Sequence, residues 1–266
     1  MTVQSAKPEA SLQKKTRRSL AATAALAALF AVGAVPQATR LADAAENGTR
    51  PLLLAQASSS DAAGDAKPAE TAAKGDVKLP EPEGHVDVEK LMAKQALPDV
   101  VIGDAKAPVT IVEYASMTCS HCRDFHQESY PQIKKDYIDT GKAKLIIREF
   151  PFDPRALAAF MLARCAGDDA KRIAMVDVLF DQQPQWAYSN QASAELLKIS
   201  RLAGMTEDQF KACLNDKELQ KKVVDVQQAG ENEFGVNATP TFFVNGDKYA
   251  GALGAAEMGA VIEKHM

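Results

Sequence analysis

The pattern with the clearest chemical meaning is the tetrapeptide Cys119-Ser120-His121-Cys122, which follows a predicted strand and opens a predicted helix. Two cysteines at this spacing can close a small disulfide ring. At a helix start the first sulfur meets unpaired backbone N–H groups and the positive end of the helix dipole, and both favour the thiolate. We therefore predict that Cys119 is a nucleophilic thiolate and that Cys122 is the resolving thiol.

His121 stands between the two cysteines. When protonated, its ring is a nearby cation that lowers the pKa of the Cys119 thiol. A stabilised thiolate stabilises the reduced form of the pair, so the disulfide becomes a strong oxidant.

Two other uses of the cysteine pair are weaker on physical grounds. A purely structural disulfide in so small a ring restricts the unfolded chain very little. A metal site built on Cys119, Cys122 and His126 has no second pair of ligands in the sequence, whereas zinc normally takes four ligands, or three and a water. We therefore expect no bound metal and no cofactor.

The elements predicted around the cysteines alternate between strand and helix. The β-branched and apolar residues at 109–114 predict a buried strand, and residues 144–150 predict a second one. Helical segments are predicted between them at 124–130 and 131–141, the latter with a proline in its first turn. This alternation indicates an α/β layer fold.

A long helical block follows at about 155–234. Within it, residues 206–209 form a capping box that opens a helix. We expect Trp186 and Tyr188 to pack in the core of this block rather than to contact substrate. Beyond it, the strand-like residues 241–244, the turn Asn245-Gly246 and the strand-like residues 248–250 predict a hairpin. A final helix is predicted at 255–264.

The N-terminal part of the chain has the features of an export signal. Four basic residues precede an Ala-rich apolar stretch, which ends at Pro36 and is followed by a small-x-small site at 42–44. We predict a signal peptide at 1–44. The stretch has too few strongly apolar residues to favour a membrane anchor. Residues 16–20 also resemble the twin-arginine export motif.

Composition separates a linker from the folded part. Residues 45–85 are rich in Ala, Ser and Pro and contain no aromatic side chain, which predicts a disordered linker. We expect the folded domain at 86–266, beginning with a helical pattern at 86–97. The chain has 46% hydrophobic and 25% charged residues, which excludes a collagen or a coiled coil. Its net charge of −4 argues against a nucleic-acid partner.

Thr239-Pro240 directly precedes an apolar strand, although proline has no N–H for the ladder of a sheet. On composition alone a trans proline at the start of a strand is favoured, because cis bonds are about 5–6% of X–Pro bonds.

Taken together, these motifs resemble those of the DsbA-like thiol:disulfide oxidoreductases. The likeness is carried by the strand, the CxxC pair with His121 and the helix, and by the downstream segment Ala-Thr-Pro-Thr-Phe-Phe-Val-Asn-Gly at 238–246. It implies a thioredoxin-like fold with an inserted helical subdomain. It also implies that Thr239 and Pro240 form a cis-proline loop that binds substrate, and that Glu113 is a buried acid assisting proton transfer at the resolving cysteine. Ser120 departs from the proline that many members carry there.

The resemblance and the export signal together predict a periplasmic thiol:disulfide oxidoreductase that introduces disulfides into reduced secreted proteins. The family implies a membrane partner of the DsbB type that re-oxidises the Cys119–Cys122 pair. A disulfide isomerase or reductase using the same site is the nearest alternative. A periplasmic metal-binding or holdase module is an alternative of another class.

Cys165 and Cys213 lie on apolar faces of two predicted helices in the insertion. Thiols of exported proteins pair in oxidising compartments. We therefore predict a structural Cys165–Cys213 disulfide beside the redox-active Cys119–Cys122 pair.

Overall fold

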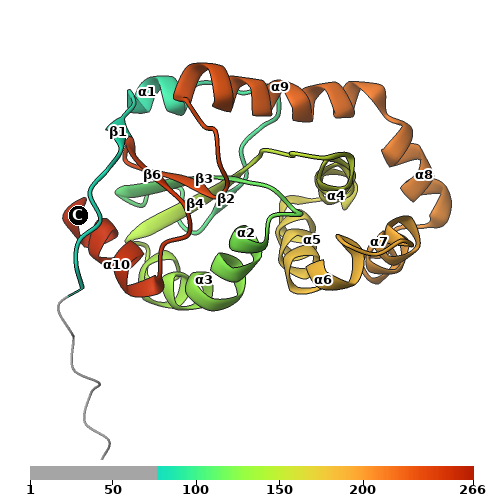
Figure 1. Cartoon of the computed structure of the whole chain (residues 1–266), viewed down its shortest axis with the longest axis horizontal. Coiled ribbons are helices and arrows are strands. Elements are labelled where there is room, and N and C mark those ends of the chain that lie inside the picture. The colour runs from blue at the N-terminus through green and yellow to red at the C-terminus, as the bar shows by residue number, and fades with distance from the viewer. Residues whose placement is uncertain (1–76) are drawn as a thin grey trace, which may run out of the picture. The chain divides into compact units, whose positions relative to one another are not determined.

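A mixed six-stranded sheet of order β1-β6-β5-β3-β4-β2 lies at the centre of residues 77–266, the part of the chain that the computed structural model describes (Figure 1). β3 and β4 pair in parallel, and the other neighbours pair antiparallel. The strands are β1 (Gly84–His85), β2 (Val101–Ile102), β3 (Val109–Ala115), β4 (Ala143–Glu149), β5 (Thr241–Val244) and β6 (Asp247–Ala250). The predicted signal peptide at 1–44 and residues 45–76 of the predicted linker lie outside the described residues.

Helices lie on both sides of this sheet. Figure 1 shows α1 and α9 on one side and α2, α3 and α10 on the other. One helical stretch runs from residue 120 to 138 and contains two π-helical turns. The helices are α1 (Val88–Leu91), α2 (Ser120–Asp124), η1 (Phe125–Ser129), α3 (Tyr130–Ile133), η2 (Lys134–Ile138), α4 (Pro154–Cys165), α5 (Asp169–Asp181), α6 (Gln183–Trp186), α7 (Ala192–Leu202), α8 (Glu207–Asn215), α9 (Lys217–Phe234) and α10 (Ala255–Lys264).

β3 divides the core because successive side chains of a strand point to opposite faces of the sheet. Ile111 and Ala115 belong to the larger core, which also contains Cys122 and the helices of the insertion. Tyr114 belongs to a smaller core on the other face. Glu113 alternates with Tyr114, so its carboxylate lies on the face of the larger core.

The residues before β3 depart from the predicted pattern. Residues 84–85, expected in the linker, form β1 and pair with β6. The helix expected at 86–97 is the single turn α1, which begins at the Asp87 cap. It is short because the carbonyl of Leu91 accepts a hydrogen bond from the buried Arg148 guanidinium (2.8 Å) instead of continuing the helical ladder. β2 has two residues, too few to produce a sequence pattern.

The predicted helical block is present as α4 to α9 between β4 and β5. Trp186 is fully buried within it, and its indole N–H donates to the carbonyl of Leu179 (2.9 Å). The expectation for Tyr188 is wrong, because this side chain is 60% exposed in the turn that follows α6.

Buried Glu149 at the end of β4 connects the insertion to the sheet. Its Oε1 pairs with Arg164 Nε (2.6 Å) on α4 and with Arg172 Nη2 (3.0 Å) on α5.

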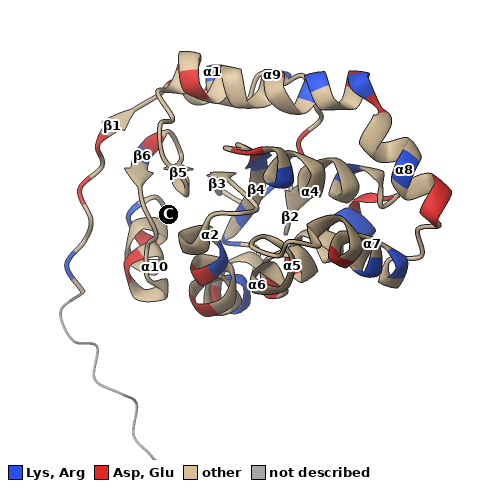
Figure 2. Ribbon diagram, turned by 45° about the vertical axis from the view of Figure 1, so that its right-hand side comes forward, with Lys and Arg blue, Asp and Glu red and all other residues tan. Residues whose placement is uncertain are grey.

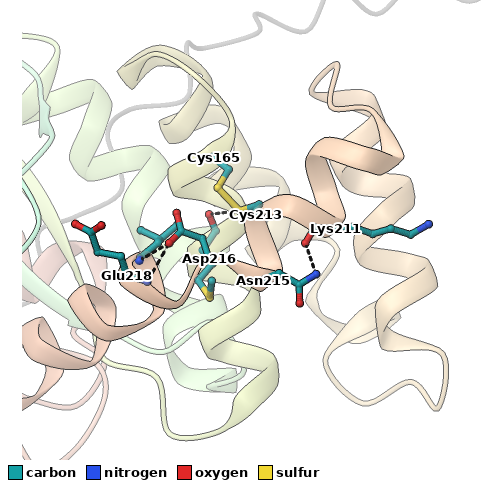
Figure 3. Close-up of a disulfide and its surroundings, with 8 residues drawn as sticks. Cys165, Lys211, Cys213, Asn215, Asp216 and Glu218 are labelled. Carbon is teal, nitrogen blue, oxygen red and sulfur yellow. Dashed lines mark hydrogen bonds between the residues drawn. A yellow bond between two sulfur atoms is a disulfide. The ribbon is translucent and has the colours of Figure 1, made fainter. Parts of the chain in front are cut away.

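Within the insertion, Cys165 at the end of α4 is joined to Cys213 of α8 by a disulfide (Figure 3). The bond lies beside the turn between α8 and α9. There the Asp216 carboxylate accepts hydrogen bonds from the backbone N–H groups of Glu218 (3.0 Å) and Leu219 (2.9 Å). The disulfide therefore joins α8 to α4, and the Asp216 cap begins α9 directly after it.

Acidic and basic residues are interspersed along the helices of the described part (Figure 2). Within residues 77–266, no helix combines the length and the apolar character needed to cross a bilayer.

The disulfide yields a prediction about stability. Replacing Cys165→Ala and Cys213→Ala together should lower the free energy of unfolding by about 4 kcal/mol, because the bond closes a loop between residues 48 apart. Urea unfolding of the oxidised proteins measures the difference. An unchanged midpoint would contradict it, as would recovery of Cys165 and Cys213 in separate, alkylated peptides from the oxidised wild type.

Candidate active site

Cys119 is the residue that caps the N-terminus of α2, and its backbone is extended. The end of β3 leads to it through Ser116, Met117 and Thr118. The backbone N–H groups of the first helical turn therefore surround its sulfur, as the sequence predicts. Cys119 is partly exposed and Cys122, one turn later, is buried; both are free thiols.

The Thr239–Pro240 peptide bond is cis and precedes β5 directly. Since β3 and β5 are antiparallel, the C-terminal end of β3 lies beside the N-terminal end of β5, with Tyr114 opposite Thr241. This pairing brings residues 120 positions apart into contact, and the thiol of Cys119 donates to the carbonyl of Thr239 (3.2 Å). The resemblance, rather than the composition, anticipates this cis bond.

The surroundings of Cys119 lower its thiol pKa from 9.0 to about 5. The largest cause is a hydrogen bond from the Cys122 thiol. Burial of the sulfur acts in the opposite direction, and contacts from the Thr239 side chain and the backbone N–H groups of Cys122 and His121 lower the pKa further. Cys119 is therefore a thiolate at neutral pH.

The pKa of Cys122 moves the other way, to well above its ordinary value. Burial is the main cause, followed by the hydrogen bond with Cys119 and the charge of Glu113. Glu113 is itself fully buried on β3, as the resemblance implies. The site thus combines one stabilised thiolate with one thiol that holds its proton.

The ring of His121 is exposed, and its backbone N–H is the part that is among the causes of the low Cys119 pKa. Any residue other than proline could supply that N–H. An effect of the ring therefore stays a prediction.

Three side chains, two from the insertion and one from the cap of α4, make four hydrogen bonds with the loop before α2, and sequence reasoning missed all of them. Buried Gln183 of α6 donates to the carbonyls of Met117 (2.8 Å) and Cys119 (2.9 Å). The hydroxyl of Tyr188 donates to the carbonyl of Thr118 (3.1 Å). The Thr118 hydroxyl donates to Asp153 Oδ2, while Asp153 Oδ1 caps α4. The Asp153-Pro154 pair is a helix-start signal visible in the sequence, whereas the other two contacts have no local signal.

His126 is a further residue that sequence reasoning considered only as a metal ligand. Its Nε2 lies 2.9 Å from Glu113 Oε2, and its side chain is 3% exposed. Within residues 77–266, no three His, Cys, Asp or Glu side chains are arranged to hold a metal ion. The imidazole instead contacts a carboxylate of the core.

The chain is similar in sequence and in fold to known proteins. The model of the thioredoxin family matches residues 95–264. A Rickettsia felis protein named protein-disulfide oxidoreductase is 38% identical over 148 residues, which are 56% of this chain and 53% of that protein. The chain therefore spans about half the length of the curated relatives that it matches.

Two solved structures extend the likeness. The alpha-DsbA1 protein of Wolbachia pipientis is 36% identical with a TM-score of 0.61, and the match covers 67% of this chain and 95% of that one. BdbD from Bacillus subtilis, at 21% identity, has the same fold, with a TM-score of 0.58 over 70% of this chain and 98% of that one. The predicted thioredoxin-like fold with an inserted helical subdomain is confirmed by these matches and by the place of α4–α9 between β4 and β5.

The low pKa of Cys119 can be titrated directly. Thiolate absorbance of the reduced protein should rise with a midpoint at about pH 5. Cys122→Ala should raise the midpoint, because it removes the largest stabilising hydrogen bond, while Cys122→Ser should raise it less, because a hydroxyl still donates. A midpoint near pH 9 in the wild type, or equal midpoints for wild type and Cys122→Ala, would contradict this assignment.

A second titration addresses the His121 ring. His121→Leu should raise the pKa of Cys119, since a protonated ring favours the thiolate. Because the ring is exposed, water screens its charge, and the shift should be smaller than that of Cys122→Ala. The same absorbance measurement checks it, and no shift at all would remove the ring from the mechanism.

Proposed function

The chain belongs to the thioredoxin family as a DsbA-like thiol:disulfide oxidoreductase, and we propose that it introduces disulfides into reduced proteins outside the cytoplasm. The observation that carries this proposal is the pair of opposite pKa shifts at Cys119 and Cys122. Stabilising the Cys119 thiolate stabilises the reduced pair, so that the disulfide is readily passed to a substrate.

The first step is attack on the Cys119–Cys122 disulfide. A substrate thiolate forms a bond to Cys119 Sγ, the bond between the two cysteines breaks, and Cys122 leaves as a thiolate that takes up a proton. A second substrate thiol then loses its proton and attacks the first substrate sulfur. Cys119 leaves as a thiolate, the substrate gains a disulfide, and the enzyme pair keeps the two electrons.

The low pKa of Cys119 favours oxidation over reduction for a kinetic reason as well. A thiol of low pKa is a good leaving group and a weaker attacking nucleophile. Cys119 leaves in the step that forms the substrate disulfide, whereas it would have to attack in a reductase or an isomerase. The low pKa of Cys119 thus supports the oxidase over these alternatives.

The reduced polypeptide is proposed to bind around Cys119. The cis Thr239–Pro240 loop lies against the sulfur, and its backbone is the proposed contact for an extended chain. On the side of the insertion, Tyr188 and Phe152 are 60% and 56% exposed. Tyr188 bonds to Thr118, and Phe152 precedes Asp153, which also bonds to Thr118. These rings offer apolar contacts to an unfolded substrate.

A periplasmic location and re-oxidation by a membrane partner of the DsbB type complete the proposal. The basic and apolar pattern at 1–44 supports export, and cysteine pairing needs an oxidising compartment. Each turnover leaves Cys119 and Cys122 reduced, so a partner must remove two electrons before the next one.

A refolding assay tests the oxidase. The oxidised protein should restore the activity of a reduced, unfolded disulfide-containing enzyme roughly tenfold faster than the assay buffer alone, because Cys119 is a good leaving group. Cys119→Ser should abolish the effect, while the Cys165→Ala and Cys213→Ala pair should retain it at a temperature where that variant is folded.

Three outcomes would contradict the oxidase. Equal rates for wild type and Cys119→Ser would exclude catalysis by this pair. Faster recovery from a scrambled, fully oxidised substrate than from a reduced one would assign the site to an isomerase. Stoichiometric copper or zinc in the reduced protein would favour the metal-binding alternative.

A further inference from the structure

Glu113 and His126 form a buried pair directly behind the cysteines. Glu113 is fully buried on β3, and its Oε2 lies 2.9 Å from His126 Nε2 on η1. Within the described residues, Glu113 Oε1 and His126 Nδ1 are buried without a hydrogen-bond partner. Each member of the pair therefore has one atom engaged with the other and one atom free.

The His126 imidazole is buried between Glu113 in the core and the wall of a groove on the surface. Its ring stacks on Phe180 of α5, with ring centroids 4.2 Å apart and planes 14° apart, and it lies 5.3 Å from the ring of Tyr130. It also lines an open groove between the active-site helix and α5. The other titratable side chains that line this groove are Tyr130, Lys134, Asp177 and Asp181.

The free atoms matter because Cys122 must exchange a proton in every cycle. Its thiolate is protonated when substrate opens the disulfide, and its thiol is deprotonated when the pair closes again. Cys122 is fully buried, so bulk water has no direct access to its sulfur. Glu113 is the carboxylate whose charge acts on Cys122, which makes it the candidate acid and base for this exchange.

Glu113 is also fully buried, so its carboxylate has no direct access to bulk water either. A carboxylate that has taken a proton from Cys122 must pass it on before the next cycle. The one polar side chain hydrogen-bonded to Glu113 among the described residues is His126, whose imidazole can accept a proton on one nitrogen and release one from the other.

We propose that His126 relays protons between Glu113 and the groove, with Asp177 at its outer end. This inference deepens the proposed function and rests on the dithiol–disulfide chemistry of Cys119 and Cys122. The Asp177 carboxylate lines the groove and interacts electrostatically with His126, so it stabilises the ring when that ring is charged. His126 acts through Glu113 and is a positioning residue, since it touches neither sulfur.

The proton balance of ring closure shows what the relay does. With Cys119 in a mixed disulfide, the Cys122 thiol transfers its proton to Glu113, and Cys122 attacks Cys119 Sγ. The bond between Cys119 and its partner breaks, and the partner leaves as a thiolate. Glu113 returns to its charged form by passing the proton to His126 Nε2, and Nδ1 releases a proton to the groove. Opening of the disulfide by substrate runs the same transfers in reverse.

Oxidised glutathione tests the relay without a protein substrate. The reduced protein attacks glutathione disulfide through Cys119, which forms an adduct, and Cys122 then displaces glutathione as the ring closes. Acid quenching and intact-mass measurement follow both steps. We expect His126→Gln and His126→Phe to slow the decay of the adduct about tenfold or more, while its formation stays close to the wild-type rate.

The two variants distinguish proton transfer by His126 from a structural role in holding Glu113. Gln keeps an amide that can donate to Glu113 but cannot carry a proton, whereas Phe keeps the aromatic stack on Phe180 and loses the hydrogen bond. Slow decay in both supports the relay. Normal decay in His126→Gln overturns it, whether or not His126→Phe is slow, because holding Glu113 would then suffice.

A surface pair keeps the proposal testable if the buried variants do not fold. Asp177 and Asp181 both lie on α5, are exposed and line the groove, but the charge of Asp177 is the one that acts on His126. Asp177→Asn should slow adduct decay by about twofold to threefold at low salt, while Asp181→Asn should not change it. Equal rates for the two variants would overturn the outer end of the relay.

The glutathione experiment and the refolding assay test separate proposals, so that either proposal can be overturned without the other. Closure of the ring on glutathione requires the cysteine pair but not an oxidase role. If His126 variants stall at the adduct while the protein fails to oxidise reduced proteins, the relay stands and the proposed function falls. If the wild-type adduct never resolves, both are overturned.

Discussion

The antiparallel pairing of β3 with β5 is the constraint on which the rest of this site depends. β3 leads into Cys119 and β5 begins directly after Pro240, so their pairing places the cis-proline loop against the nucleophile. The two segments are separated by the whole insertion, and no local interaction could bring them together. The register also sets the face of Glu113, because a shift of one residue would move its carboxylate out of the core that holds Cys122.

Cys119 and Cys122 differ in reactivity because the two thiols differ in burial and in the hydrogen bonds that they receive. Cys119 lies at the end of the helix, where backbone N–H groups and the Cys122 thiol stabilise its charge. Cys122 lies one turn deeper, where burial and the charge of Glu113 oppose a second negative charge. The reduced pair therefore carries one negative charge, on Cys119, and one thiol proton, on Cys122.

The insertion does more than cover the site. Gln183 and Tyr188 reach the carbonyls of the loop that carries Cys119, and Glu149 binds α4 and α5 to the sheet through two arginines. Tyr188 also shows the limit of composition arguments. An aromatic residue near a buried tryptophan is a reasonable core candidate, but its position in a turn leaves the ring exposed and its hydroxyl bonded to the active-site loop.

The sequence by itself determined the cysteine pair, the central strands, the hairpin and the helical block, because strand composition, helix capping and turn chemistry are local properties of consecutive residues. The likeness of two distant motifs to one family also indicated the thioredoxin-like fold. Only the tertiary structure decided that His126 pairs with Glu113 and that Gln183 supports the loop. Those contacts join residues from separate elements, and their partners are chosen by packing and by the need to satisfy polar groups in a core, which no local pattern records.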